Sequence, residues 1–189
     1  MRTMFATAYC AAVVCLQPHA ASAIASSIAA SLADYQVSLS ITAIQGIPDR
    51  SISGAAFNAT TKTIYAVDDA SCAIYELTTN GAVTRVIPTS GFEDLEGIAY
   101  HTGNFFYIAE EAQANIVHIE IPSSGAETLS KGKGTVFNIA SGWGNTGLEG
   151  VAFCPSKSLV YCVKEKGPPR LYRITLDGAG TPKEAFPND

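Results

Sequence analysis

The sequence has few basic residues and never gathers them into a run. Lysine and arginine number 12 against 17 aspartates and glutamates, which gives a formal charge of −5 at pH 7. Nucleic acids and anionic membranes are bound by clustered Lys and Arg, so neither is an expected partner. An acidic chain of this kind favours cations and neutral or cationic partners instead.

Long hydrophobic runs are also missing. The N-terminal apolar stretch, residues 4–16, has about 13 residues, whereas about 20 are needed to span a bilayer. It follows Arg2 and precedes Ala21-Ser22-Ala23, a small-residue pattern typical of signal-peptidase cleavage. We therefore predict a signal peptide over residues 1–23, a linker over 24–36, and a periplasmic or secreted mature chain with no stable membrane span. An uncleaved anchor is the alternative.

Cysteines do not provide a disulfide framework. Two of the five lie in the predicted signal peptide, which leaves Cys72, Cys154 and Cys162, an odd number. In a hairpin that begins at Cys154, a four-residue turn would place Leu159 rather than Cys162 opposite it. We expect three small buried hydrophobic residues.

Motifs for nucleophilic catalysis and for zinc or iron are absent. The sequence has no Ser/His/Asp pattern, nucleophile elbow or Gly-rich phosphate loop, and no suitable spacing of cysteines or histidines. His118 alternates with Val117 and Ile119 in a predicted strand and is expected to be a packed or surface residue. Trp143 lies in a Gly-rich loop, where it either packs against a neighbouring sheet or offers a ligand platform. The sequence therefore does not favour an enzyme.

What the sequence does contain is a repeat. Glycine, an apolar residue, alanine and an aromatic residue follow one another three times, at Gly54–Phe57, Gly97–Tyr100 and Gly150–Phe153, with spacings of 43 and 53 residues. Because side chains alternate across a strand, the glycine and the alanine share one face. Another backbone must approach that face closely.

Each repeat continues as an antiparallel sheet. A second and a third apolar strand follow every aligned segment, and residues 83–87 and 136–139 can supply a fourth. Four strands in each such period are typical of a β-propeller blade. We predict an all-β domain over residues 37–189 with about three four-stranded blades. Their approximate bounds are 51–90, 93–140 and 146–186.

Three blades are fewer than the four or more that close a propeller ring. We therefore expect an incomplete ring with two open faces that expose positions such as Phe57 and Phe153. Residues 37–41 resemble an outer strand that would join the last blade of a complete ring, and residues 123–134 are interpreted as a loop on one rim. Open edges favour aggregation of such a chain, and the alternative is self-association with a second chain that closes a ring.

Glutamates precede the second and third aligned glycines. These are Glu96 and Glu149, whereas Ser53 takes the same place in the first repeat. The first strand of each propeller blade lines the central axis, so these side chains should converge. Calcium, which takes six to eight oxygen ligands, would neutralise their repulsion. The alternative is that each glutamate accepts backbone N–H groups at a strand entrance and binds no ion.

A second acidic set lies where the second strand of each repeat ends. Its members are Asp68, Asp69, Glu110, Glu111 and Glu165. These residues either complete the same cation site from further out or are solvated strand ends.

In these segments the chain resembles the SdiA-regulated (YjiK-like) family. The motifs that carry the resemblance follow the family's order between about residues 34 and 176. They are Ser53-Gly54, Asp94–Tyr100, Ala109–Glu111, Gly147–Ala152 and Lys164–Pro168.

The resemblance implies a β-propeller distantly related to NHL repeats, with calcium at a site shared by family members and no established reaction. It points to Glu96 and Glu149, and further to Glu111 and Glu165, as the metal ligands. Family domains carry more blades after the Lys164–Pro168 motif. We therefore expect this chain to lack any ligands that those blades supply.

The resulting hypothesis is an exported calcium-binding propeller that acts as a binding or scaffolding module, with a ligand or protein of unknown identity at its rim. One rival is a calcium-dependent propeller hydrolase, similar to phosphoesterases or lactonases, in which the ion polarises an oxygen of the substrate. Another is a metal-free protein-interaction module. A general acid or base beside the ion would favour the hydrolase, and neither predicted-strand histidine occupies an aligned axial position.

Overall fold

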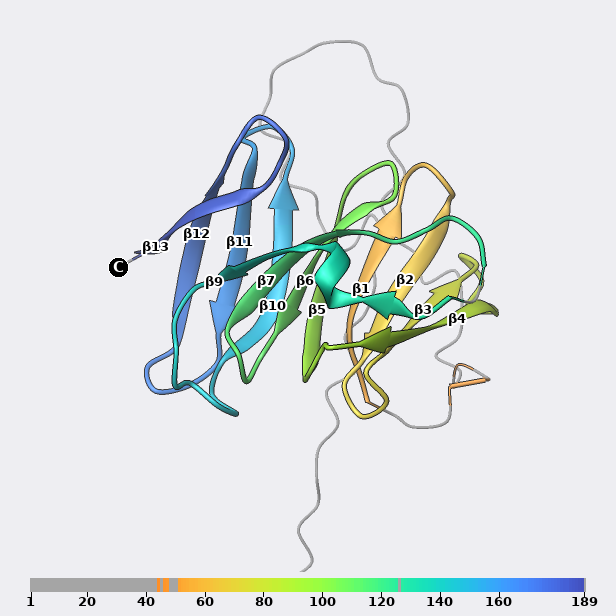
Figure 1. Ribbon diagram of the computed structural model, residues 1–189, viewed down its shortest axis with the longest axis horizontal. Coiled ribbons are helices and arrows are strands. Elements are labelled where there is room, and N and C mark those ends of the chain that lie inside the picture. Colours follow the sequence, from red (N-terminus) through yellow and green to blue (C-terminus); the bar gives the residue numbers. More distant parts are fainter. Residues whose placement is uncertain (1–43, 45, 48–50, 126, 189) are drawn as a thin grey trace, which may run out of the picture.

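The structure is a computed structural model that describes residues 44, 46–47, 51–125 and 127–188 (Figure 1). The predicted signal peptide, the linker and the outer strand at 37–41 lie outside the described residues. In the described part, no helix is long and apolar enough to cross a membrane.

The described chain forms three sheets that stand side by side (Figure 1), each with four antiparallel strands and the first with a short fifth strand, β8 (Leu129–Ser130), that pairs in parallel. The first sheet consists of β1 (Ile52–Asn58), β2 (Thr63–Asp68), β3 (Ala73–Leu77) and β4 (Val83–Ser90). The second consists of β5 (Leu95–Thr102), β6 (Phe105–Glu110), β7 (Asn115–Glu120) and β9 (Thr135–Asn138). The third consists of β10 (Leu148–Cys154), β11 (Leu159–Lys164), β12 (Arg170–Leu176) and β13 (Pro182–Asn188). The predicted all-β architecture of three four-stranded, propeller-like blades is confirmed, and the sheets do not close into a ring.

The innermost strands β1, β5 and β10 touch through the aligned glycines. A Cβ atom added to Gly54 would lie 2.9 Å from the Cα of Gly97, and one added to Gly97 would lie 3.1 Å from the Cα of Gly150. Real Cβ atoms essentially never lie within 3.0 Å of another heavy atom and seldom at 3.1 Å, because van der Waals repulsion rises steeply at such distances. The glycines therefore set the spacing between neighbouring sheets, as the sequence predicts.

Two hydrophobic clusters fill the spaces between the sheets. Between the first and second sheets, the buried rings of Tyr65 and Phe106 lie 4.7 Å apart, and Ile74, Ile98 and Val117 pack around them. Between the second and third sheets, a separate cluster contains Tyr107, Ile116, Leu148, Val160 and Ile174. Because successive side chains of a strand point to opposite faces, the second sheet contributes apolar side chains to both clusters. It is therefore apolar on both faces.

The segment 123–134 is more than the predicted rim loop. It returns to the first sheet, where β8 (Leu129–Ser130) pairs in parallel with the end of β4. A short 3-10 turn over Lys131–Lys133 follows, and the Lys131 ammonium lies 3.1 Å from the fully buried Glu110 carboxylate. This connection ties the first and second sheets together, which periodicity could not predict because the pairing is non-local.

One face of the third sheet stays open. Equivalent positions on β2, β6 and β11 are Val67, Ala109 and Val163, with exposed fractions of 0%, 0% and 43%. Equivalent positions on β3, β7 and β12 are Ile74, Ile116 and Leu171, with exposed fractions of 0%, 0% and 40%. In the first two sheets the next sheet covers these side chains. The third sheet therefore presents a blade-packing surface to solvent.

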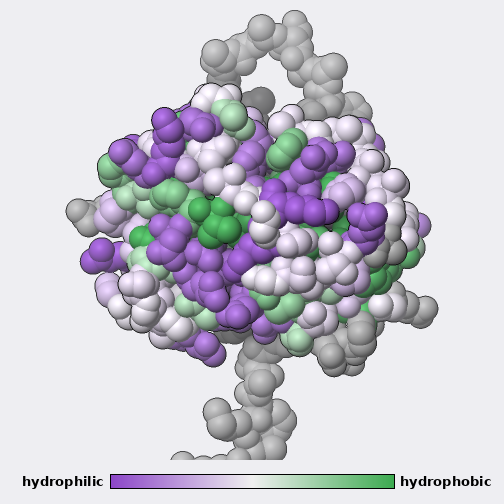
Figure 2. Space-filling view, viewed as in Figure 1, coloured by the Kyte–Doolittle hydropathy of each residue, from purple (hydrophilic) through white to green (hydrophobic). Residues whose placement is uncertain are grey.

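The expected second open face and the expected exposed residues were wrong. Phe153 packs between the second and third sheets with its ring 5.6 Å from that of Tyr107, and Phe57 is half-buried. On the outer face of the first sheet, Tyr75 and Leu77 are buried and Ile47 packs against them. The face shown in Figure 2 carries hydrophilic side chains interspersed with small apolar areas.

The three described cysteines are free thiols, as predicted, but only Cys162 is buried; Cys72 and Cys154 are partly exposed, so the expectation of three buried residues was wrong for these two. Cys154 faces Leu159 across the β10–β11 hairpin, which is the register that the sequence predicts. Cys162 is buried in the cluster between the second and third sheets.

Candidate functional site

Glu96 and Glu149 each lie in a β-bulge at the start of an innermost strand. In the second sheet, Leu95 pairs with Glu110 and Gly97 pairs with Ala109, so that Glu96 has no partner. The same register shift skips Glu149 in the third sheet and Ser53 in the first. A bulge redirects the side chain of its extra residue. Glu96 and Glu149 therefore have a side-chain orientation that they would not have in a regular strand.

The acidic residues that follow β2, β6 and β11 are held beside these bulges by one repeated hydrogen bond. The backbone N–H of Asp69, Glu111 and Glu165 donates to the carbonyl three residues before the aligned glycine, at Ser51, Asp94 and Gly147 respectively. The N···O distances are 3.1, 3.0 and 3.0 Å. The hydrogen bond thereby fixes the C-terminal end of β2, β6 or β11 beside the bulge of the innermost strand in the same sheet.

The carboxylates gather into two neighbouring triads. One oxygen from each of Glu111, Glu149 and Glu165 lies within 4.8 Å of the others. A second triad, Asp69, Asp94 and Glu96, meets the same limit. Three of the four predicted ligands therefore converge on one point, and the fourth, Glu96, belongs to the adjacent triad. We call the six residues the axial carboxylates.

Asp94 is a member that the sequence interpretation missed. It stands two residues before Glu96 in the quoted motif, but the equivalent positions are Ser51 and Gly147, so the repeat alignment gives no signal. Its backbone has φ = +59°, and one carboxylate oxygen accepts the N–H of Ala112 at 3.2 Å. Aspartate tolerates this left-handed conformation better than most residues, which is the one local clue to its role.

Two residues of the predicted second acidic set have structural partners instead. The buried Asp68 accepts the N–H and the hydroxyl of Ser71 at 2.7 and 2.8 Å. The buried Glu110 accepts the N–H of Glu93 at 2.9 Å and pairs with Lys131. These two carboxylates stabilise turns and the connection between sheets.

The axial carboxylates disfavour each other's charge. Burial, followed by the charge of Glu149, raises the pKa of Glu96 to about 7. Burial, followed by the charge of Asp94, raises the pKa of Glu111 to about 7. Burial also raises the pKa of Glu149, with a further contribution from Glu165. Lys166, which forms an ion pair with Glu165, is largely exposed and offsets little of this repulsion.

The donor set fits a hard cation. All six residues offer carboxylate oxygens, which suit calcium, and no thiol or imidazole stands among them as zinc would prefer. The alternative, in which Glu96 and Glu149 accept backbone N–H groups, has little support: within the described ranges, no backbone N–H hydrogen-bonds to either carboxylate. Among the axial carboxylates, Glu111 accepts the N–H of Gly147 at 3.2 Å and Asp94 accepts that of Ala112.

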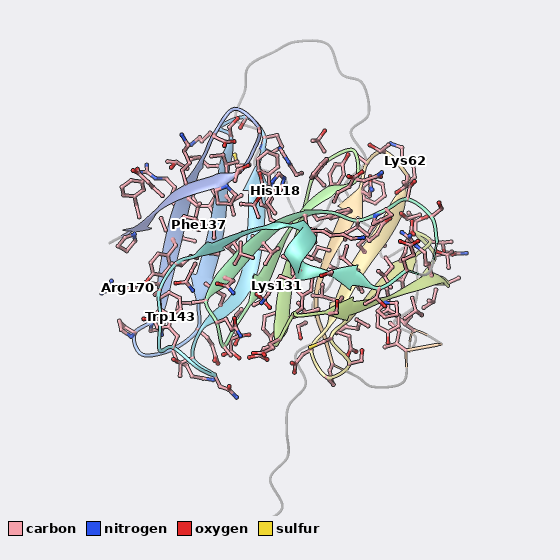
Figure 3. All side chains as sticks on the ribbon, in the orientation of Figure 1. Lys62, His118, Lys131, Phe137, Trp143 and Arg170 are labelled. Carbon is pink, nitrogen blue, oxygen red and sulfur yellow. The ribbon has the colours of Figure 1, made fainter. Side chains whose placement is uncertain are left out.

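Trp143 packs rather than standing free beside the triad. Its ring lies 5.5 Å from that of Tyr172, and the Lys164 ammonium stands 5.2 Å from its centroid. Figure 3 places Trp143 near the lower ends of the sheets in that view, with Arg170 close by and His118 nearer the opposite ends.

Comparison with known proteins gives a family and a fold. The model of the SdiA-regulated family matches residues 27–185. The chain is also similar to a solved nidogen/laminin complex, with 19% identity over 72% of this chain and 47% of that one and a TM-score of 0.50. A catalytically inactive virginiamycin B lyase from Staphylococcus aureus shows 18% identity over 75% of this chain and 43% of that one, with a TM-score of 0.50.

A putative 6-phosphogluconolactonase from Bacteroides uniformis shows 13% identity, with 72% of this chain and 41% of that one covered and a TM-score of 0.55. At these identities the likeness concerns the fold alone. The chain spans less than half the length of each of these proteins.

Proposed function

The chain belongs to the SdiA-regulated family, and on that basis we propose that it is an exported, calcium-binding β-propeller module without a reaction of its own. The observation that carries the proposal is the convergence of Glu111, Glu149 and Glu165 from two different sheets within 4.8 Å. Like charges held this closely destabilise a fold unless a cation or protons neutralise them.

A bound calcium ion would link neighbouring sheets. Glu111 follows β6 in the second sheet, whereas Glu149 and Glu165 belong to the third. The adjacent triad links the first and second sheets in the same way, through Asp69 and Glu96. An ion shared across such a seam stabilises the packing of whole sheets, because it binds the folded arrangement far better than the unfolded chain. This is the role of a scaffold rather than of a catalyst.

Export supports the choice of calcium. Extracellular calcium modules bind with dissociation constants of about 10⁻⁴–10⁻³ M, which open, partly solvated carboxylate sites provide. Fused to a reporter, residues 1–23 should direct secretion and be removed. An intact Met1 on the exported protein would favour the anchor instead.

Metal analysis tests the proposal. The refolded mature chain, equilibrated with calcium, should retain the ion in mass spectrometry, and the Glu96→Gln plus Glu149→Gln variant should lose it. The matched control is Glu120→Gln plus Glu184→Gln, which removes two exposed carboxylates from other parts of the sheets. A wild-type chain that retains no calcium, or a control that loses it equally, would contradict the proposal.

One observation favours a hydrolase as the second candidate. An ion held by Glu111, Glu149 and Glu165 would leave Glu96, whose pKa in the ion-free chain is raised to about 7, as a neighbouring carboxylate that could exchange a proton. A screen against aryl esters, lactones and phytate tests this candidate. Turnover that disappears in the Glu96→Gln plus Glu149→Gln variant would establish an enzyme.

We further propose that the open face of the third sheet, with Val163 and Leu171, mediates self-association. These positions are covered by a neighbouring sheet elsewhere in the molecule, and a second copy of the chain carries sheets of the same kind. The rim loops remain the proposed place for a ligand or protein partner.

A further inference from the structure

Two histidines meet at the end of the sheets opposite the axial carboxylates. His101 lies near the end of β5, in a second bulge between Tyr100 and Thr102. The pairings of β1 and β10 show only the bulge at their start. The second bulge brings the His101 ring to His118 on β7, although β6 lies between the two strands. The sequence shows no spacing of histidines that suits a metal, yet the structure brings these two together within one sheet.

The two imidazoles face each other through nitrogen atoms. Nδ1 of His101 lies 3.0 Å from Nε2 of His118, and the ring centroids are 5.1 Å apart. Tyr107 lies under both rings, at 5.2 Å from His101 and 4.8 Å from His118. The ring of Phe153 meets His101 edge-on at 4.8 Å. Aromatic packing thus fixes both rings, and only 9% of His118 is exposed.

The packing keeps both rings neutral. Burial, followed by the neighbouring His101, lowers the pKa of His118 to about 4, and burial lowers the pKa of His101 as well. A neutral imidazole is the form that binds a metal ion.

A depression of about 310 Å³ adjoins His101. Its lining includes Thr102, Phe153 and Ser158, together with the β12–β13 turn over Asp177–Gly180. The Tyr107 hydroxyl donates to the carbonyl of Gly180, and the ring of His101 packs against the same glycine. One Asp177 oxygen accepts the N–H groups of Ala179 and Thr181 at 2.8 and 2.9 Å, which leaves its second oxygen for other contacts. The turn thus holds a carboxylate at the edge of the histidine pair.

We propose that His101 and His118 form a second metal site, for a late first-row transition ion such as Cu²⁺ or Zn²⁺, with water completing the coordination and the nearby Asp177 carboxylate favouring the positive charge of the ion. Two imidazole nitrogens bound to zinc at 2.0–2.1 Å in a tetrahedral site stand about 3.3 Å apart, close to the present separation. Binding needs each ring to turn so that its lone pair points at the ion rather than at the other ring, with the shared proton moving to the other nitrogen of its ring. Calcium prefers oxygen ligands, so the two sites differ in the ion that they select.

The position is particular to the second sheet. At the places equivalent to His101, the other sheets carry Asn58 and Cys154, and at those equivalent to His118 they carry Glu76 and Arg173. Glu76 pairs with Arg85 at 2.8 Å, and Arg173 stacks on Phe186. The position of His118 is buried in the first and second sheets and exposed in the third, and of the three sheets only the second offers two nitrogen ligands there.

Electron paramagnetic resonance of the untagged mature chain with one equivalent of Cu²⁺ tests the proposal. We expect hyperfine coupling to two nitrogens, unchanged by excess calcium and by Glu149→Gln. His101→Gln and His118→Gln should each remove one nitrogen and weaken binding at least tenfold. Asp177→Asn, on an exposed turn that keeps its backbone hydrogen bonds, should weaken binding while retaining both nitrogens. Binding without nitrogen coupling, or coupling that survives both glutamine substitutions, would overturn the proposal.

A Co²⁺ titration supplies the second readout. Sulfur-to-cobalt charge-transfer absorption would assign the ion to the partly exposed Cys154 and contradict the histidine site. Its absence, with d–d bands that disappear in His101→Gln, would support that site. Because the readouts concern nitrogen and sulfur ligands, failure here is distinguishable from failure of the calcium proposal.

Discussion

The carboxylate of Glu149, in the bulge of β10, lies within 4.8 Å of the carboxylate of Glu111, at the end of β6 in the neighbouring sheet. Both side chains are kept there by backbone geometry rather than by their own attraction. Removing one charge should therefore relieve repulsion in the ion-free chain. We expect Glu149→Gln to stabilise the calcium-free protein by about 1 kcal/mol, the order expected for a partly solvated pair.

With calcium bound, the wild type should be the more stable of the two proteins, because the ion adds more stability to the wild type than to Glu149→Gln. Thermal melts with a chelator and with excess calcium measure both effects. The exposed Glu120→Gln is the control and should change neither melt. A Glu149→Gln chain that is less stable in both conditions would show that Glu149 has a structural role only.

The raised pKa values predict a falling stability as the pH rises. Glu96 and Glu111 have pKa values of about 7 in the folded state and near 4.5 when unfolded, so the folded chain binds more protons between these values. Stability from these groups is fully present below about pH 4.5 and is lost as the pH approaches and passes 7. Urea melts of the calcium-free chain at pH 5 and pH 8 should show the difference.

The control for the pH prediction is the Glu96→Gln plus Glu111→Gln variant. It removes both titrating groups, so its stability should vary less over the same range. Equal pH dependence in the variant would mean that other groups are responsible.

The glycine contacts between innermost strands predict a sharp cost for one methyl group. Gly97→Ala would place a Cβ 3.0 Å from the backbone nitrogen of Val151 and 3.1 Å from the Cα of Gly150. We expect a loss of about 2–3 kcal/mol in the free energy of unfolding, since backbone on both sides cannot move without separating the sheets. Gly178→Ala, where a Cβ meets nothing within 4 Å, should have a small effect. Similar losses at both positions would argue against close packing at the axis.

The open face predicts how the chain associates. Val163, on the open face, and Val136, on the outer strand of the covered second sheet, are exposed to 43% and 45%. Val163→Lys should reduce the mass measured by light scattering, because it places a charge in the self-associating surface, whereas Val136→Lys should not. A monomeric wild type that melts cooperatively would contradict self-association.

The ion pair between Lys131 and Glu110 predicts how much the 123–134 connection contributes to the free energy of unfolding. Lys131→Ala leaves the fully buried Glu110 carboxylate without its cation and should cost about 3 kcal/mol. Adding Glu110→Gln should recover part of the loss, because the buried charge is then removed. Chemical denaturation of the two variants measures both. No recovery in the double variant would mean that Lys131 acts by packing alone.

The repeat made most of the fold predictable. Gly97 and Gly150 mark the innermost strands. Neighbouring backbones approach each other so closely there that only a residue without a side chain fits. The alternating pattern after each glycine predicts the sheets, and the Cys154–Leu159 register follows from turn length. Glu96 and Glu149 were predicted as ligands because equivalent positions in successive blades line the axis, and the structure places them in adjacent triads.

The remaining features depend on contacts that no local pattern records. Asp94 was not predicted as a site residue because its equivalents in the other repeats, Ser51 and Gly147, carry no charge. The pairing of β8 with β4 joins residues about 40 positions apart in a segment rich in glycine and serine. His101 and His118 meet only because a bulge turns one of them across β6. Such features follow from register and chain path, which are set by the whole fold.

The most direct test of the central claim is a calcium titration by calorimetry on the mature chain at neutral pH. The account predicts saturable binding with a dissociation constant of about 10⁻⁴–10⁻³ M. It also predicts that Glu96→Gln plus Glu149→Gln removes this binding and that Glu120→Gln plus Glu184→Gln preserves it. A wild-type isotherm indistinguishable from that of the Glu96→Gln plus Glu149→Gln variant would contradict the assignment of the axial carboxylates as a calcium site.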